Sequence, residues 1–287
     1  MANFNIKTAT LGGMQFWTDY RWVAGVRLQR NDVTKHWRVL DARNVRQSWG
    51  RREDCEQSFD EFVQQFHPNL RYQRVAILMH GLMRTPRSMR SMASAIKAAI
   101  PCETISPTYA SSRAPMADHA EALRSIVESL PGEPIVDFVA HSMGNIVIRH
   151  ALNDWKKLGD PKNALKRMHR MVMLGPPNQG ATIAKRLAKT GLFGVIAGQG
   201  GLDLGRDWDQ LQSNLAIPEF PFAIVAGKHS GPLSKHPLVE GDNDLVVSVE
   251  ETHLEGAEVE IEVPVLHSFL MDSKDVQRRA IEFLSQA

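Results

Sequence analysis

The sequence of 287 residues has little cysteine and no long hydrophobic run. Its two cysteines, Cys55 and Cys102, cannot build the disulfide framework of a small secreted protein, although one bridge between them stays open. A transmembrane helix needs about 18 or more consecutive apolar residues, and no such stretch is present. The N-terminal residues also lack the apolar stretch of a signal peptide. We therefore expect a cytoplasmic protein with no transmembrane segment and at most transient contact with a membrane surface.

A large excess of charge of either sign is also absent. The chain has 34 basic and 32 acidic residues, and its formal net charge is +2. This balance gives no general case for nucleic acid as a partner. With 43% hydrophobic residues, a chain of this length can bury a sizeable core and needs neither a disulfide nor a metal to hold it together. The length favours one large domain with additions over two small domains.

Short apolar runs alternate with amphipathic stretches from residue 75 onward. We predict strands at 75–79, 103–105, 135–139, 171–174, 222–226 and 259–263, and helices at 88–100, 116–130, 146–158 and 275–284. Strands alternating with helices indicate a mostly parallel sheet covered by helices on both faces. Val259–Val263 alternates apolar and charged residues, which is typical of a strand near the sheet edge.

Residues 1–70 differ from the rest, and we interpret them as a β-rich extension followed by a helix at Glu53–Phe66. Strand and turn signals at 4–9, 15–18, 22–29 and 36–40 predict a β-meander, either added to the main sheet or packed as a small cap. Four tryptophans occur here: Trp17, Trp22, Trp37 and Trp49. We interpret them mainly as a hydrophobic anchor, with a substrate or partner surface as the alternative. Residues 71–287 would form the catalytic domain.

The chemistry centres on Ala140-His141-Ser142-Met143-Gly144. This is the small-x-Ser-x-Gly pattern of a nucleophile elbow, with a predicted strand before it and a predicted helix after it. A serine held on such a tight turn needs small residues two positions to either side, and Ala140 and Gly144 meet this requirement. The alternative interpretation is a serine that only caps a helix. The flanking strand and helix favour Ser142 as a nucleophile.

A serine hydroxyl needs a base to take its proton, usually a histidine oriented by a carboxylate. Of the eleven histidines, His267 lies between the last predicted strand and the last helix, where it would overhang the carboxyl ends of the strands. His253 is the rival, but its acidic neighbours are typical of a surface. Asp242 and Asp244 are both candidates for the acid. The pair could also suggest a cation site, but two carboxylates with few further ligands are weak support for one.

The oxyanion of an acyl-transfer intermediate needs two preorganised N–H donors. One would be the amide of Met143, directly after the serine. The other would come from the loop after the first core strand, where Leu82 follows His80-Gly81. We expect His80 to be structural, and His141 to belong to the packing of the elbow because its side chain points away from that of Ser142.

These motifs resemble the α/β-hydrolase superfamily, in particular bacterial triacylglycerol lipases and their esterase relatives, including proteins that resemble inositol deacylases. The similar residues are His80-Gly81-Leu82, the Ser142 pentapeptide, Asn243-Asp244 with Val246, and His267. His267 follows Asp244 by 23 positions, the separation typical of these lipases, so the resemblance favours Asp244 over Asp242. Leu245 stands where the lipases carry glycine. The resemblance covers residues 73–285.

From this resemblance we expect a serine hydrolase that cleaves a small-molecule or lipid carboxylic ester without a metal or organic cofactor. Acyl transfer or thioester hydrolysis on the same residues is an alternative, as is a non-catalytic member that only binds. We also interpret 189–215 as a candidate lid, since Gly191–Gly205 is rich in glycine and apolar residues. A packed loop is the other interpretation of that segment.

Overall fold

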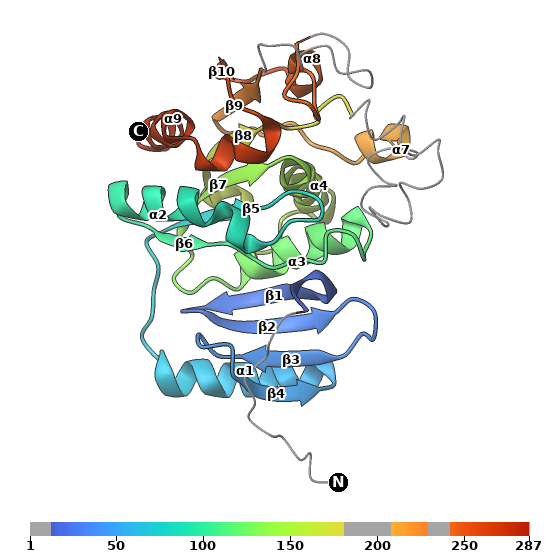
Figure 1. Ribbon diagram of the computed structural model, residues 1–287. Helices are drawn as coiled ribbons and strands as arrows, with labels where there is room; N and C mark the ends of the chain where they lie inside the picture. Colours follow the sequence, from blue (N-terminus) through green and yellow to red (C-terminus); the bar gives the residue numbers. More distant parts are fainter. Residues whose placement is uncertain (1–12, 181–207, 229–241, 287) are drawn as a thin grey trace.

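The computed structural model describes residues 13–180, 208–228 and 242–286, which build two β-sheets and the helices packed on them (Figure 1). The larger sheet has six parallel strands in the order β10-β9-β8-β7-β5-β6. Their bounds are β5 Arg74–Met79, β6 Glu103–Ile105, β7 Ile135–His141, β8 Met168–Leu174, β9 Phe222–Gly227 and β10 Val259–Val263. The predicted parallel sheet is confirmed, and β10 lies at an edge as its alternating pattern indicated.

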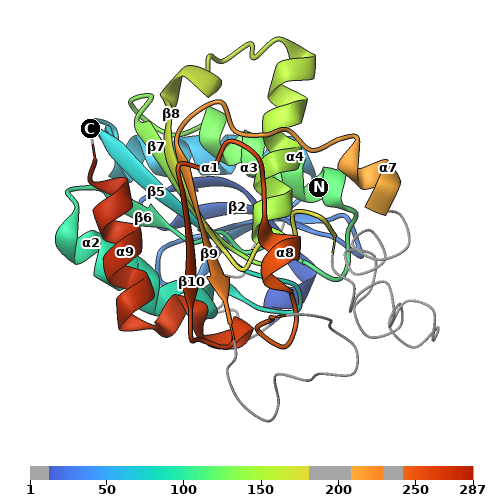
Figure 2. The ribbon, with the colours of Figure 1, turned by 90° about the horizontal axis from the view of Figure 1, so that it is seen from above.

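Helices cover both faces of this sheet (Figure 2). Side chains of α2 (Arg90–Ala99) and α9 (Lys274–Leu284) share one buried cluster with one side of the strands. Side chains of α3 (Met116–Glu128) and α4 (Met143–Leu158) share a second cluster with the other side. Two short helices, α7 (Trp208–Gln212) and α8 (Val249–Thr252), complete the α-helices described around this sheet. The four inner strands, β5, β7, β8 and β9, are buried on both faces along almost all of their length, as is usual for parallel strands.

Local sequence sets the ends of these helices. The chain leaves α4 through Gly159, whose φ of 75° lies in the left-handed region that glycine reaches without strain. At the start of α8, the Ser248 hydroxyl accepts the Glu251 N–H and the Glu251 carboxylate accepts the Ser248 N–H. This reciprocal pair is a capping box, and it fixes the chain a few residues after Asp244.

The N-terminal extension forms a separate four-stranded sheet with neighbours in chain order, so the predicted meander is confirmed. Its strands are β1 Trp17–Val23, β2 Val26–Asn31, β3 Trp37–Leu40 and β4 Arg46–Gly50. The single strand predicted at 22–29 was wrong, because Ala24 and Gly25 both have positive φ and make a turn inside it. The predictions also missed β4. Of the two placements left open, the packed cap is correct.

Strand β1 of this sheet lies next to α3, and α1 (Arg52–Phe66) packs on the sheet beside β3 and β4 (Figure 1). Cys55 and Phe59 of α1 pack with strand residues in one buried cluster, which also takes in Ala122 of α3. Helix α3 therefore serves both sheets. Trp37 is buried in the extension, as an anchor would be, whereas Trp49 is 46% exposed, so the anchor interpretation holds only in part.

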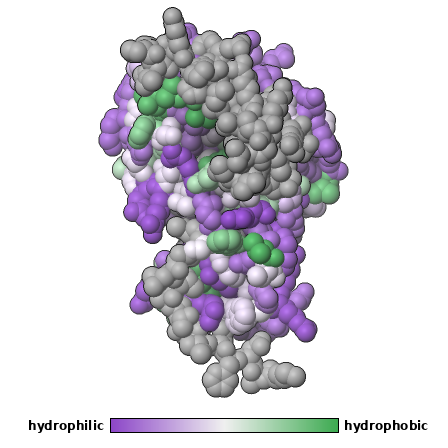
Figure 3. Space-filling view, turned by 45° about the vertical axis from the view of Figure 1, so that its right-hand side comes forward, coloured by the Kyte–Doolittle hydropathy of each residue, from purple (hydrophilic) through white to green (hydrophobic). Residues whose placement is uncertain are grey.

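The structure also bears on the possible disulfide, on membrane-spanning helices and on the candidate lid. Both cysteines are free, so the bridge left open by the sequence is not formed. No helix in the described ranges is long and apolar enough to cross a bilayer. Hydrophilic residues cover most of the coloured surface in Figure 3, and hydrophobic ones gather in small patches. The predicted strand at 4–9 and most of the candidate lid, including Gly191–Gly205, lie outside the described residues.

Candidate active site

Ser142 occupies the turn between β7 and α4, with φ 52° and ψ −124°. Such a backbone conformation is costly for a residue with a side chain and persists only where the surroundings enforce it. Here the Ser142 N–H donates to the Leu174 carbonyl of β8 at 2.9 Å. The Asn145 side-chain amide donates to the Ser142 carbonyl at 3.0 Å. The turn therefore has the geometry of a nucleophile elbow, as the sequence predicted.

Close packing around the elbow requires glycine at position 144, two residues after the serine. A Cβ atom on Gly144 would lie 2.8 Å from the His80 carbonyl oxygen and 2.8 Å from the Met79 Cβ. Atoms at that distance would force α4 away from β5. Glycine at this position therefore lets the helix begin directly against the end of the neighbouring strand.

Asp244 and His267 form a buried pair, with Oδ2 of the carboxylate 2.7 Å from Nδ1 of the imidazole. The other carboxylate oxygen accepts the N–H groups of Val246 and Val247, at 3.0 and 2.8 Å. The backbone N–H of His267 also donates to the backbone carbonyl of Asp244 at 3.2 Å. All of these bonds hold the ring in one orientation, with Nδ1 toward the carboxylate. Asp242 instead forms an ion pair with Lys228 at 2.7 Å, and its side chain is 60% exposed.

Ser142 and the His267 ring both lie against the end of β8. A Cβ atom on Gly175 would lie 2.9 Å from Nδ1 of His267, while the preceding residue, Leu174, binds the Ser142 amide. No hydrogen bond joins the Ser142 hydroxyl to the His267 imidazole among the residues described. Such bonds are often long without substrate and tighten in the complex.

The two predicted oxyanion donors flank the elbow. The Leu82 N–H donates to no other residue in the described part of the chain. Met143 is the first residue of α4, where an N–H has no acceptor in a preceding helical turn. The loop that carries Leu82 lies close to the serine, because a Cβ atom on Gly81 would be 3.1 Å from the Ser142 Cβ. Both amides are thus available beside Ser142.

The two histidines of these motifs, His80 and His141, are buried. Burial lowers the pKa of His80 to about 4, so its ring is neutral, and its Nδ1 lies 2.9 Å from the Gly81 carbonyl. Burial also lowers the pKa of His141 well below its ordinary value, with the neighbouring His267 adding to the effect. Both rings are buried and lie next to a backbone carbonyl, as is usual for histidines that pack inside a protein. His253, the rival base, is exposed and pairs with Glu260 at 2.9 Å.

Three features near the site carry no recognisable sequence signal. Asn145 holds the elbow carbonyl, as described above. Ser111 accepts the Met83 N–H at 2.9 Å, although it comes from a segment with no motif. Leu245 has a φ of 79°, the left-handed conformation that the glycine of the resembling lipases would adopt freely. The structure therefore places leucine in a backbone conformation that favours glycine.

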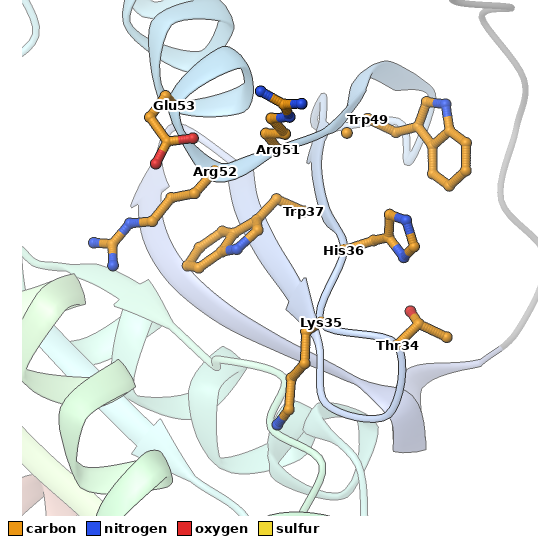
Figure 4. A pocket seen from close by; sticks show the side chains of 9 residues that line it. Thr34, Lys35, His36, Trp37, Trp49, Arg51, Arg52 and Glu53 are labelled. Atoms are coloured by element: carbon orange, nitrogen blue, oxygen red, sulfur yellow. The ribbon is translucent and has the colours of Figure 1, made fainter.

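A cavity lies in the extension, where β4 leads into α1 (Figure 4). Its volume is about 460 Å³. Trp37, Trp49, His36, Lys35 and Arg51 are among the side chains that line it. None of its lining residues belongs to the elbow, to the Asp244–His267 pair or to the Leu82 loop. In the described part of the chain, no group of three or more His, Cys, Asp or Glu residues is arranged to hold a metal ion.

Comparison with known proteins supports the fold. No family model and no curated protein sequence matches the chain. Among solved structures, a Bacillus licheniformis lipase in its mature form is 18% identical, with a TM-score of 0.56 over 77% of this chain and 95% of that one. Aspergillus fumigatus lipase B is 10% identical, with a TM-score of 0.51 over 75% of this chain and 52% of that one. A metagenomic carboxyl esterase is 16% identical, with a TM-score of 0.50 over 74% of each chain. The chain has the α/β-hydrolase fold.

Proposed function

We propose that this chain is a serine hydrolase that cleaves carboxylic esters through an acyl-enzyme on Ser142. The observation that carries the proposal is the strained elbow of Ser142 beside the buried Asp244–His267 pair. His267 takes the hydroxyl proton as Oγ attacks the ester carbonyl, and then gives it to the leaving alkoxide. Water, activated by the same imidazole, attacks the acyl-enzyme and releases the acid. Asp244 holds the ring and stabilises the imidazolium that forms in each half of the reaction.

The negative charge that develops on the carbonyl oxygen needs donors already in place. The N–H groups of Leu82 and Met143 are the candidates, since both lie beside Ser142 and lack an acceptor among the described residues. The lipases and the esterase of the same fold make a small-molecule or lipid ester the substrate class that we propose. No step of this mechanism calls for a metal or an organic cofactor.

A fluorophosphonate probe tests the nucleophile. The native chain should be labelled once, and Ser142→Ala should not be labelled at all. Labelling of the alanine variant would place the nucleophile elsewhere. Hydrolysis of p-nitrophenyl esters of increasing acyl length, with and without micelles, would then define the substrate range. Loss of hydrolysis in both Ser142→Ala and His267→Ala, with native melting temperatures, is the expected result.

A further inference from the structure

The loop after β5 is hydrogen-bonded to the segment of residues 108–111, which in turn contacts the N-terminal extension. The Met83 N–H donates to the Ser111 hydroxyl at 2.9 Å, and the Tyr109 hydroxyl donates to the His80 carbonyl. Ser111 and Tyr109 are buried, so water does not compete for these bonds. The residues on both sides of Gly81-Leu82 are therefore fixed by one segment, residues 108–111, which follows β6.

That segment is in turn fixed by strand β1 of the extension. The Asp19 carboxylate accepts the Thr108 N–H at 2.7 Å, and the Asp19 N–H donates to the Thr108 carbonyl at 2.9 Å. The Thr18 hydroxyl accepts the Ala110 N–H at 3.1 Å. Thr18 and Asp19 are each 1% exposed. These polar side chains lie inside the protein because they pair with the backbone of the segment, which is the usual condition for burying them.

A direct contact joins the extension to the loop as well. The Gln15 side-chain amide, just before β1, donates to the Arg84 carbonyl at 2.9 Å. Between these contacts, Met83 has a φ of 57° while its side chain is 50% exposed. Packing of that side chain does not account for the strained backbone, whereas the bond from its N–H to Ser111 does.

We propose that the N-terminal extension is a positioning element of the candidate active site. Strand β1 fixes residues 108–111, and Ser111 and Gln15 fix the loop that aims the Leu82 N–H beside Ser142. The proposal rests on the proposed function, in which that N–H is an oxyanion donor. A donor lowers the barrier only if it is already in place when the charge develops, so a loosened loop lowers kcat more than it raises KM. Ser111 and Gln15 are positioning residues that act through Leu82.

The first test compares Ser111→Ala with the unaltered chain in hydrolysis of a p-nitrophenyl ester. We expect kcat to fall about 10-fold with KM little changed, and the rate of fluorophosphonate labelling at Ser142 to fall in parallel. Ser111→Thr keeps the hydroxyl and should restore much of the rate. Ser129→Ala is the matched control, because its hydroxyl donates only to the Ile126 carbonyl at the end of α3. Gln15→Ala gives an independent variant should the buried substitution impair folding.

Hydrogen exchange provides a measurement that needs no substrate. The amides of residues 81–84 should exchange faster in Ser111→Ala and Gln15→Ala than in the native chain, and at the native rate in Ser129→Ala. Native exchange in both variants would overturn the proposal, as would a native kcat in a chain whose Ser142 is labelled by fluorophosphonate. The second outcome would leave the proposed function intact. A native chain that neither cleaves esters nor takes the probe would instead overturn the proposed function and, with it, the positioning of an oxyanion donor.

Discussion

The rings of His141 and His267 lie with their centroids 4.6 Å apart, and Nε2 of His141 is 2.9 Å from the backbone carbonyl oxygen of His267. A carbonyl oxygen only accepts hydrogen bonds, so Nε2 carries the proton of the His141 ring. Burial holds the pKa of His141 well below its ordinary value, which leaves the ring neutral. The residue before Ser142 therefore also anchors the loop that presents His267.

Replacing His141 by phenylalanine should weaken this anchor while retaining an aromatic ring. The His267 carbonyl would lose its partner in a buried place, which costs about 1–3 kcal/mol of the free energy of unfolding. We expect kcat to fall more than KM rises, because His267 is less well placed but the substrate contacts remain. Urea unfolding and ester kinetics measure the two effects. His253→Phe is the control on an exposed histidine, and a native kcat in His141→Phe would contradict the anchoring role.

The acid of the site should be Asp244 and not Asp242. Asp244 is buried against His267, whereas Asp242 is an exposed partner of Lys228. Loss of the corresponding aspartate lowers turnover by about 10⁴-fold in a well-studied protease, so Asp244→Asn should nearly abolish ester hydrolysis. Asp242→Asn should leave kcat almost unchanged. Because Asp242 lies at the surface, the substitution should also change the free energy of unfolding by no more than about 0.5 kcal/mol in either direction. The opposite ranking in a steady-state assay would assign the acid to Asp242.

The sequence predicts those parts of the site that are fixed by local chemistry. The elbow needs small residues around Ser142, and Gly144 shows why, because a side chain there would collide with the end of β5. Alternation in Val259–Val263 likewise predicts an edge strand, since one face of an edge strand meets water. In both cases the physical requirement acts on neighbouring residues of the chain and therefore leaves a pattern.

Contacts between distant segments leave no such pattern. Ser111 supports the Leu82 loop only because β1 holds its segment, and the two lie about 90 positions apart, as the Asp19–Thr108 bond shows with a separation of 89. The turn at Ala24-Gly25 was missed because alanine rarely adopts positive φ, and Leu245 adopts it where glycine was expected. In each case the surrounding structure overrides the local preference of the residue.

Buried His119 should make the stability depend on pH. Its pKa is lowered to about 4, first by burial, whereas the ordinary value is 6.5. Between these values the unfolded chain binds a proton that the folded chain does not, so the free energy of unfolding falls as pH drops. The contribution is complete above pH 6.5, is lost toward pH 4, and has a slope of about 1.4 kcal/mol per pH unit.

His119→Phe removes this titration and keeps a ring beside Tyr109, whose ring centroid is 5.0 Å from that of His119. Urea unfolding from pH 5 to 7.5 should then show a shallower loss of stability than in the native chain. The slope that remains should include His80, whose pKa is also lowered to about 4 by burial. Equal slopes in the two proteins would show that His119 takes up a proton in the folded state as readily as in the unfolded one.

Alanine substitutions at two glycines with similar backbone conformations can distinguish backbone strain from a steric clash at the site. Gly175 has a φ of 53° and Gly159 a φ of 75°. Alanine in such a left-handed conformation costs about 1–2 kcal/mol, so both Gly175→Ala and Gly159→Ala should lower the unfolding midpoint. Nothing lies within 4 Å of a Cβ atom on Gly159, whereas one on Gly175 would be 2.9 Å from the His267 nitrogen that binds Asp244.

Only Gly175→Ala should therefore impair hydrolysis. The imidazole would have to move to relieve the contact, which would break its bond to the carboxylate and shift it relative to Ser142. A displacement of about 1 Å at a reacting group can cost on the order of 100-fold in rate, and we expect a loss of that size in kcat. Gly159→Ala should keep its native kcat at temperatures below its melting transition. If the two variants are equally active after their stabilities are matched with temperature, His267 cannot be the base at the position that the structure gives it.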